Sequence, residues 1–186
     1  MLKAIESKYL VEDVDVRVLR DYEALKINDK VINLRRGSEV KVPRWLARKL
    51  AKEGYVTIIT KEEISYDEIS RYVFLEGQGG PAPASLIKLP KNFYIMYRDY
   101  IKSLTSALKE KYEPKLLEEL EKSKRAVQEL VNVRLRKILI AVQMGIPIEE
   151  LRDRLAYEEE VLYSSVSRII REWNKECVLT SLGGES

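Results

Sequence analysis

The side chains that most often carry enzyme chemistry are almost absent from this sequence. Its 186 residues include no histidine and one cysteine, Cys177. Histidine is the usual general base near neutral pH and the commonest metal ligand, so histidine-based triads and metal sites are excluded. A single cysteine cannot form an internal disulfide, and it argues against a thiolate zinc site. Carboxylate and lysine chemistry remain open.

Three consecutive glutamates, Glu158, Glu159 and Glu160, are candidate metal ligands or acid–base groups. Consecutive residues fan out around a helix, so their carboxylates cannot converge on one ion. They stand at the start of a predicted helix, where the helix dipole favours negative charge. We therefore interpret them as helix-stabilising residues. An enzyme that uses other carboxylates remains a hypothesis that rests only on the number of acids.

Phosphate-binding and calcium-binding loops are also missing. The sequence has no GxxxxGK[ST], no GxGxxG after a strand and no DxDxDG-type loop. Its one glycine-rich segment, residues 77–84, contains no lysine and is better interpreted as a hinge or linker. We therefore predict that the protein is not an enzyme, with no catalytic residues, no metal and no cofactor.

Basic residues gather in one stretch, although the net charge of the whole chain is only +3. Between residues 35 and 52, seven Lys and Arg residues accompany a single acid, Glu39. Such a stretch can follow a phosphate backbone, but it is more often a solvated face. The candidate contacts to DNA or to a partner are Arg35, Arg36, Arg44, Arg48 and Lys49. Trp45 is expected to fill a small core, and only an exposed indole would favour stacking on a base.

The first 61 residues predict a small β-rich domain with one helix. Val14, Val16 and Val18 alternate with polar residues, which is typical of a half-buried strand. A hairpin is expected to turn at residues 28–29, and Pro43 begins a short helix that ends near Gly54.

Residues 62–182 predict an all-α helical bundle, so the fold class is α+β. Helices are expected at 61–76, 92–111, 115–144, 148–155 and 157–176. The segment 77–90 holds three glycines and three prolines. It is expected to form an irregular excursion or a mobile loop.

The thirty-residue helix at 115–144 organises this domain. It has no internal proline or glycine, and its second half is apolar around most of its circumference. A helix of that kind is buried on several sides. It is either the central helix of a bundle or part of a subunit interface, and the two are compatible. Arg134 and Lys137 must reach water or meet carboxylates.

Four segments resemble the subunits of the GINS complex. They are VKVPRWLARKL at 40–50, LPKNFYIMYRDYI at 89–101, RLRKI at 134–138 and LAYEEEVLY at 155–163. The resemblance extends from about residue 10 to 176. The β-rich domain comes first, as in the archaeal subunit related to eukaryotic Psf2 and Psf3. The family usually has threonine where this chain has Ala156.

The resemblance implies a non-catalytic subunit of a 2:2 tetramer with a second, permuted GINS subunit. The expected partners are the MCM helicase, a RecJ-like Cdc45 homologue, and primase or polymerase components. The location would be cytoplasmic and nucleoid-associated, without a membrane segment, and the high charge content is thermophile-like. The residues expected in the helical core and subunit interface are Leu130, Val131, Leu135, Ile138, Val142, Tyr97 and Ile169.

Overall fold

The computed structural model describes residues 2–27, 30–59 and 64–179. Internal contacts divide the chain into two compact units, Met1–Glu62 and Glu63–Ser186. We call them the β-rich unit and the helical unit. The hairpin turn predicted at residues 28–29 lies outside the described residues.

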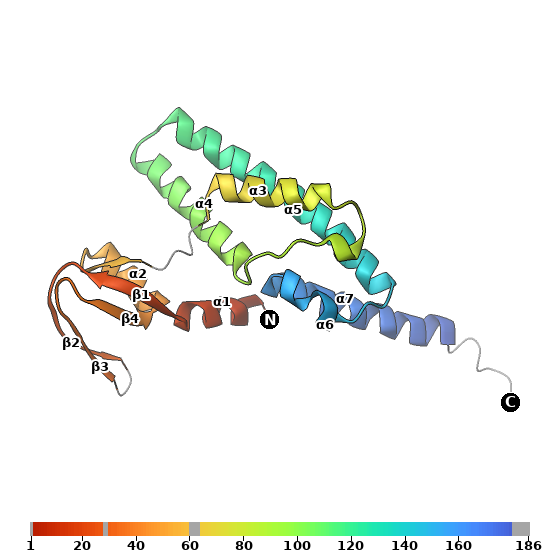
Figure 1. Cartoon of the computed structure of the whole chain (residues 1–186), viewed down its shortest axis with the longest axis horizontal. Coiled ribbons are helices and arrows are strands. Elements are labelled where there is room, and N and C mark those ends of the chain that lie inside the picture. Colours follow the sequence, from red (N-terminus) through yellow and green to blue (C-terminus); the bar gives the residue numbers. More distant parts are fainter. Residues whose placement is uncertain (1, 28–29, 60–63, 180–186) are drawn as a thin grey trace. The chain divides into compact units, whose positions relative to one another are not determined.

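The β-rich unit packs one short helix on a small antiparallel sheet (Figure 1). Its elements are α1 (Leu2–Val11), β1 (Asp13–Val18), β2 (Tyr22–Ile27), β3 (Lys30–Leu34), β4 (Glu39–Pro43), α2 (Arg44–Lys52) and β5 (Val56–Ile58). Strand β1 lies between β4 and β5, and β2 pairs with β3 as a separate ribbon. Helix α1 was not expected from the sequence, because its apolar residues lack a clear helical period.

Apolar and polar residues alternate along β1, and the apolar ones form part of the core of this unit. Val14, Val16 and Val18 are buried together with Leu46 and Leu50 of α2. Successive strand residues point to opposite faces, so the polar residues between these valines lie on the outer face of the sheet.

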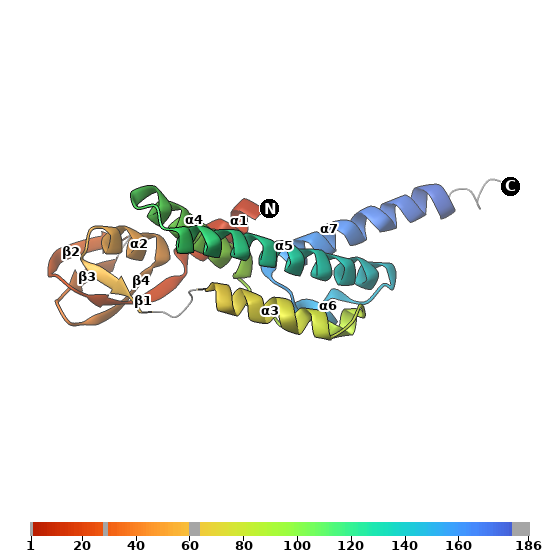
Figure 2. The same ribbon diagram turned by 90° about the horizontal axis from the view of Figure 1, so that it is seen from above.

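The helical unit is built around one long helix (Figures 1 and 2). Its elements are α3 (Tyr66–Gln78), a 3₁₀ turn (Pro83–Ser85), α4 (Phe93–Glu110), α5 (Pro114–Gln143), α6 (Ile148–Leu151), a second 3₁₀ turn (Arg152–Arg154), α7 (Tyr157–Asn174) and a π-helical turn (Lys175–Leu179). Helix α5 contacts α3, α4 and α7. It begins at Pro114, whose fixed φ suits the first helical position. After it the chain turns at Gly145, which has a φ of +67°.

Much of the apolar half of α5 is covered by its own chain. Leu130 packs with Ile69, Leu89 and Phe93 in one buried cluster. Ile138 packs in a second cluster that includes residues of α6 and α7. Helix α5 is therefore the central helix of a bundle, and its part in a subunit interface stays a prediction.

The segment at residues 77–90, which we call the Gly/Pro segment, is irregular, as predicted, but it is packed rather than loose. Pro83, Leu86 and Leu89 are buried. Helix α3 ends at Gln78, so the first two residues of the segment still belong to that helix. A Cβ at Gly79 would lie 2.7 Å from the Cβ of Ser85, so this close approach requires glycine. The expectation of a mobile loop is wrong because apolar residues inside the segment anchor it.

Candidate interaction surfaces and a buried ion network

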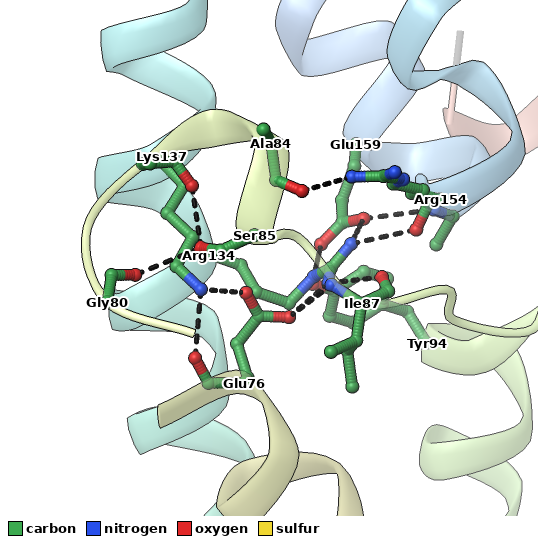
Figure 3. A network of polar contacts seen from close by, with 12 residues as sticks. Glu76, Gly80, Ala84, Ser85, Ile87, Tyr94, Arg134, Lys137, Arg154 and Glu159 are labelled. Carbon is green, nitrogen blue, oxygen red and sulfur yellow. Dashed lines mark hydrogen bonds and ion pairs between the residues drawn. The ribbon is translucent and has the colours of Figure 1, made fainter. Parts of the chain in front are cut away.

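A buried network of hydrogen bonds and ion pairs is centred on Arg134 of α5 (Figure 3). Its side chain is fully buried. The Nε donates to Glu159 Oε1 at 2.6 Å, and Nη2 donates to Glu159 Oε2 at 2.7 Å. On the other side, Nη1 donates to Glu76 Oε2 at 2.5 Å. One guanidinium therefore joins the end of α3 to the start of α7 through two carboxylates.

Lys137 completes this network one helical turn further along α5. Its Nζ donates to Glu76 Oε1 at 2.5 Å and to the Glu76 carbonyl at 2.8 Å. The buried set then holds two cations, Arg134 and Lys137, and two carboxylates, Glu76 and Glu159. Each buried charge has a partner of opposite sign, which the low dielectric of the interior demands. The sequence-based expectation for Arg134 and Lys137 is confirmed.

Electrostatics keep the arginine charged and the neighbouring phenol neutral. Burial disfavours a charged guanidinium, but hydrogen bonds and attraction from Glu159 and Glu76 leave the pKa of Arg134 raised. Tyr94 donates its hydroxyl to Glu159 Oε1 at 2.8 Å. Burial, and then the charge of Glu159, raises the pKa of Tyr94 far above its ordinary value. Tyr94 is therefore a hydrogen-bond donor at every physiological pH.

The network also fastens the Gly/Pro segment to the bundle. Arg134 Nη1 donates to the Ile87 carbonyl, and Nη2 donates to the Arg154 carbonyl, both at 3.0 Å. The Arg154 side chain donates in turn to the Ala84 carbonyl. Because its donors and carboxylates are saturated by one another, we interpret the network as a structural clamp rather than a catalytic site.

The three glutamates at the start of α7 diverge, as their spacing predicted. Glu159 enters the buried network and accepts from the Ala156 backbone N–H at 2.9 Å. This bond is the half of a capping box that the glutamate makes, whereas the half that a threonine hydroxyl would make with the Glu159 N–H has no counterpart at Ala156. Glu160 pairs with Lys91 at 2.6 Å. Among the described residues no group of three acids or cysteines could hold a metal ion.

The Glu158 carboxylate lies apart from those of Glu159 and Glu160, and it is largely buried. Neither of its buried carboxylate oxygens accepts a hydrogen bond within the described part of the chain. The nearest cation is Arg98, whose Nη2 lies 3.7 Å from Oε1. Burial raises the pKa of Glu158. The sequence interpretation of the triplet as helix-stabilising residues therefore missed two features, the role of Glu159 in the core and the burial of the Glu158 carboxylate without a hydrogen bond from any described residue.

A surface pocket near the start of α3 contains several carboxylates, which the enzyme hypothesis would require. Its volume is about 300 Å³, and it is lined by residues that include Asp67, Glu118, Glu119 and Lys122. A hydrogen bond from Lys122, at 2.6 Å, lowers the pKa of Glu118. A carboxylate held ionised in this way suits a salt bridge and not proton donation.

The predicted interface residues separate into three environments. Leu130, Ile138 and Val142 are buried in the core of this chain. Val131 and Tyr97 are half-buried against the same core. Leu135 is half-buried, and Ile169 is exposed. The first three side chains support the bundle itself, and Ile169 is the one best placed to meet another chain.

Exposed apolar residues mark two helices of the helical unit. On α7, Ile169 and Trp173 are each 58% exposed and lie four residues apart, hence on one face. On α3, Phe74 is 64% exposed beside Leu75. Figures 1 and 2 show that the second half of α7 extends beyond the other helices of its unit. These faces are candidate subunit contacts.

The predicted basic face is not one surface. Arg44 is buried, with its guanidinium carbon 4.0 Å from the centre of the Tyr9 ring. It is therefore not an exposed contact, which corrects the sequence prediction. Arg35 and Arg36 lie exposed in the turn between β3 and β4. These two cations therefore belong to a turn, whereas the other predicted contacts lie on α2.

Helix α2 carries the remaining basic residues, and it exposes its tryptophan. Arg48 is half-buried, and Lys49 is exposed. Trp45 is 45% exposed, whereas Leu46 fills the core position next to it. The expectation that Trp45 plugs the core is wrong. The adjacent leucine occupies the buried side of the same helix.

The fold and these surfaces define a class of protein: a helical bundle with a buried ion network, joined in sequence to a small β-rich unit. The family model of the GINS complex protein helical bundle domain, Sld5, matches residues 50–178. The chain therefore belongs to the GINS complex protein family. No curated protein matches it. The matched range covers almost all of the described helical unit.

Family membership confirms the prediction that this chain is a subunit of a GINS complex. It indicates a role in the GINS complex in DNA replication, with other GINS subunits as partners. The GINS complex is known as a non-catalytic, structural assembly. Along the described part of the chain, no helix is long and apolar enough to cross a membrane.

Proposed function

We propose that this chain is a non-catalytic subunit of an archaeal GINS complex, of the type related to Psf2 and Psf3. The order of its units supports the proposal, because the β-rich unit precedes the family-matched helical bundle. In this role it pairs with a permuted GINS subunit in a 2:2 tetramer. The tetramer holds the MCM helicase, the RecJ-like Cdc45 homologue, and primase or polymerase components in one assembly.

The exposed face of α7 is the observation that carries the scaffold role. Val166 and Ile170 pack against the core of their own unit, whereas Ile169 and Trp173 turn outward. Two large apolar side chains four residues apart on a helix suit packing against another helix. An obligate interface would extend this contact to about 2,000 Å² or more.

Sedimentation of the full chain with its partner subunit tests this proposal. Ile169→Asp combined with Trp173→Asp places two charges at the contact, so the complex should dissociate at micromolar concentration. Ser164→Asp is the matched control, because Ser164 is an exposed polar residue of the same helix. The control should sediment as wild type. A wild-type chain that stays monomeric with the partner present would refute the scaffold role.

A general DNA-binding module, the alternative function, loses one of its five residues because Arg44 is buried. Arg35 and Arg36 are exposed, but the Arg36 backbone N–H donates to Asp21 Oδ1 at 2.6 Å, which brings a carboxylate to that turn. The remaining support lies on α2.

A further inference from the structure

The outer face of α2 combines one aromatic and three basic side chains. They follow the spacing i, i+3, i+4 and i+7, which places them within one arc of about 100°. We call this set the α2 stripe: Trp45, Arg48, Lys49 and Lys52. The opposite side of the helix carries the buried Leu46 and Leu50.

Two cations of the α2 stripe, Lys49 and Lys52, have no carboxylate partner in the described part of the chain. On the outer face of the sheet, Arg17 pairs with Glu39 at 2.8 Å and Lys41 lies 3.9 Å from Asp15. In contrast, neither Lys49 nor Lys52 forms a salt bridge with any described residue. Arg48 lies 5.6 Å from the Tyr9 ring centre and adds a third positive charge. An occupant of this face must therefore be negatively charged.

Trp45 narrows the choice of occupant. Its indole is 45% exposed at one end of a row of cations, outside the buried cluster that forms the core of this unit. An aromatic ring beside basic side chains is the arrangement with which proteins stack a base and neutralise its phosphates. We propose that the α2 stripe binds single-stranded nucleic acid, with Trp45 stacked on a base and the three cations along the phosphates.

The dimensions of the stripe match a short strand. Seven residues of helix separate Trp45 from Lys52, which is about 10 Å. At 3.4 Å per nucleotide of stacked strand, this length spans about three nucleotides. A single strand is favoured over a duplex because its bases have open faces on which an indole can stack. An acidic protein segment would neutralise the lysines but would offer the indole no flat ring.

Tryptophan fluorescence of the full chain provides a direct test. The chain has two tryptophans, and Trp173 lies in the helical unit. In a Trp173→Phe background the signal comes from Trp45 alone. Titration with oligo(dT) should quench this signal, and log Kobs should fall with log salt with a slope of about −2, as expected for three phosphate contacts.

Two substitutions and one matched control locate the site. Trp45→Ala should weaken oligo(dT) binding, measured by anisotropy of a labelled oligonucleotide, by about fivefold or more. Lys49→Glu should also weaken it severalfold and flatten the salt slope. Lys41→Glu makes the same charge change on the outer face of the sheet, so it should leave the affinity within about twofold. Circular dichroism verifies that each variant is folded.

The outcomes separate this proposal from its rivals and from the scaffold role. Binding of oligo(dT) or oligo(U) that depends on Trp45 supports the proposal and identifies the nucleic acid. The absence of quenching would overturn it. Equal losses in Lys41→Glu and Lys49→Glu would also overturn it, as would tighter, Trp45-independent binding of polyglutamate, which would point to an acidic protein. None of these results depends on assembly through α7.

Discussion

The two units use the same basic side chains in opposite ways. On α5, Arg134 and Lys137 are buried and contact two carboxylates at 2.5 to 2.7 Å. On α2, Lys49 and Lys52 face outward without a salt bridge to any described residue. The first pair stabilises a fold, and the second leaves positive charge available for a ligand.

This difference teaches that the environment of a cation is set by distant segments. Glu76 lies 58 residues before Arg134, and Glu159 lies 25 residues after it. Neither carboxylate is a helical neighbour of the arginine, so the clamp exists only when α3, α5 and α7 are packed together. On α2, Lys49 and Lys52 are exposed, and within the described residues no carboxylate from another segment pairs with them.

Arg134→Ala should have the largest effect. It leaves Glu76 and Glu159 buried without their main partner, so the free energy of unfolding should fall by about 3–5 kcal/mol. Urea unfolding of the full chain, followed by far-ultraviolet circular dichroism, measures the loss. Arg125→Ala is the control, because Arg125 is exposed on the same helix, and its effect should stay within about 0.5 kcal/mol. Similar losses in both variants would contradict the clamp.

Glu158→Gln should have a smaller effect, and in the opposite direction at neutral pH. Burial raises the pKa of Glu158, so ionisation of this carboxyl opposes folding as the pH rises. The amide removes that charge and keeps the shape of the side chain. Its loss of the contact with Arg98 costs little, because Arg98 is exposed.

The pH dependence gives the sign of this second prediction. Below the unfolded pKa the carboxyl is protonated in both states, so variant and wild type should be equally stable near pH 3. At pH 7 the variant should be more stable by about 1 kcal/mol. Urea midpoints at the two pH values measure the difference. A variant that is less stable at pH 7 would show that the pairing with Arg98 outweighs the burial of the charge.

Most of the fold was predictable because its signals are local. Pro114 and Gly145 bracket α5, and the alternating valines of β1 identify a strand with one buried face. Helix α1 was missed because it lacks an apolar period. The Gly/Pro segment was misjudged because composition does not show that Leu86 and Leu89 are buried against the bundle.

The candidate sites were less predictable because they depend on pairing between distant segments. The sequence required partners for Arg134 and Lys137, but it gave no means to choose Glu76 and Glu159 among thirty acids. Trp45 was expected in the core, but the neighbouring Leu46, one position along α2, is the buried residue. This difference of one position along the helix decides whether the indole is buried or exposed to a ligand.

Lys49→Ala should have the smallest effect on stability, within about 0.5 kcal/mol, because it removes an exposed charge that has no partner among the described residues. Thermal unfolding of the β-rich unit within the full chain, followed by Trp45 fluorescence in the Trp173→Phe background, measures it. Lys137→Ala, measured by far-ultraviolet circular dichroism, is the matched contrast, because it removes one of the two cations that pair with the buried Glu76 carboxylate and should cost several times more. If Lys49→Ala destabilised the β-rich unit by more than 1 kcal/mol, Lys49 would belong to the fold. Its loss of nucleic-acid binding would then have a structural cause.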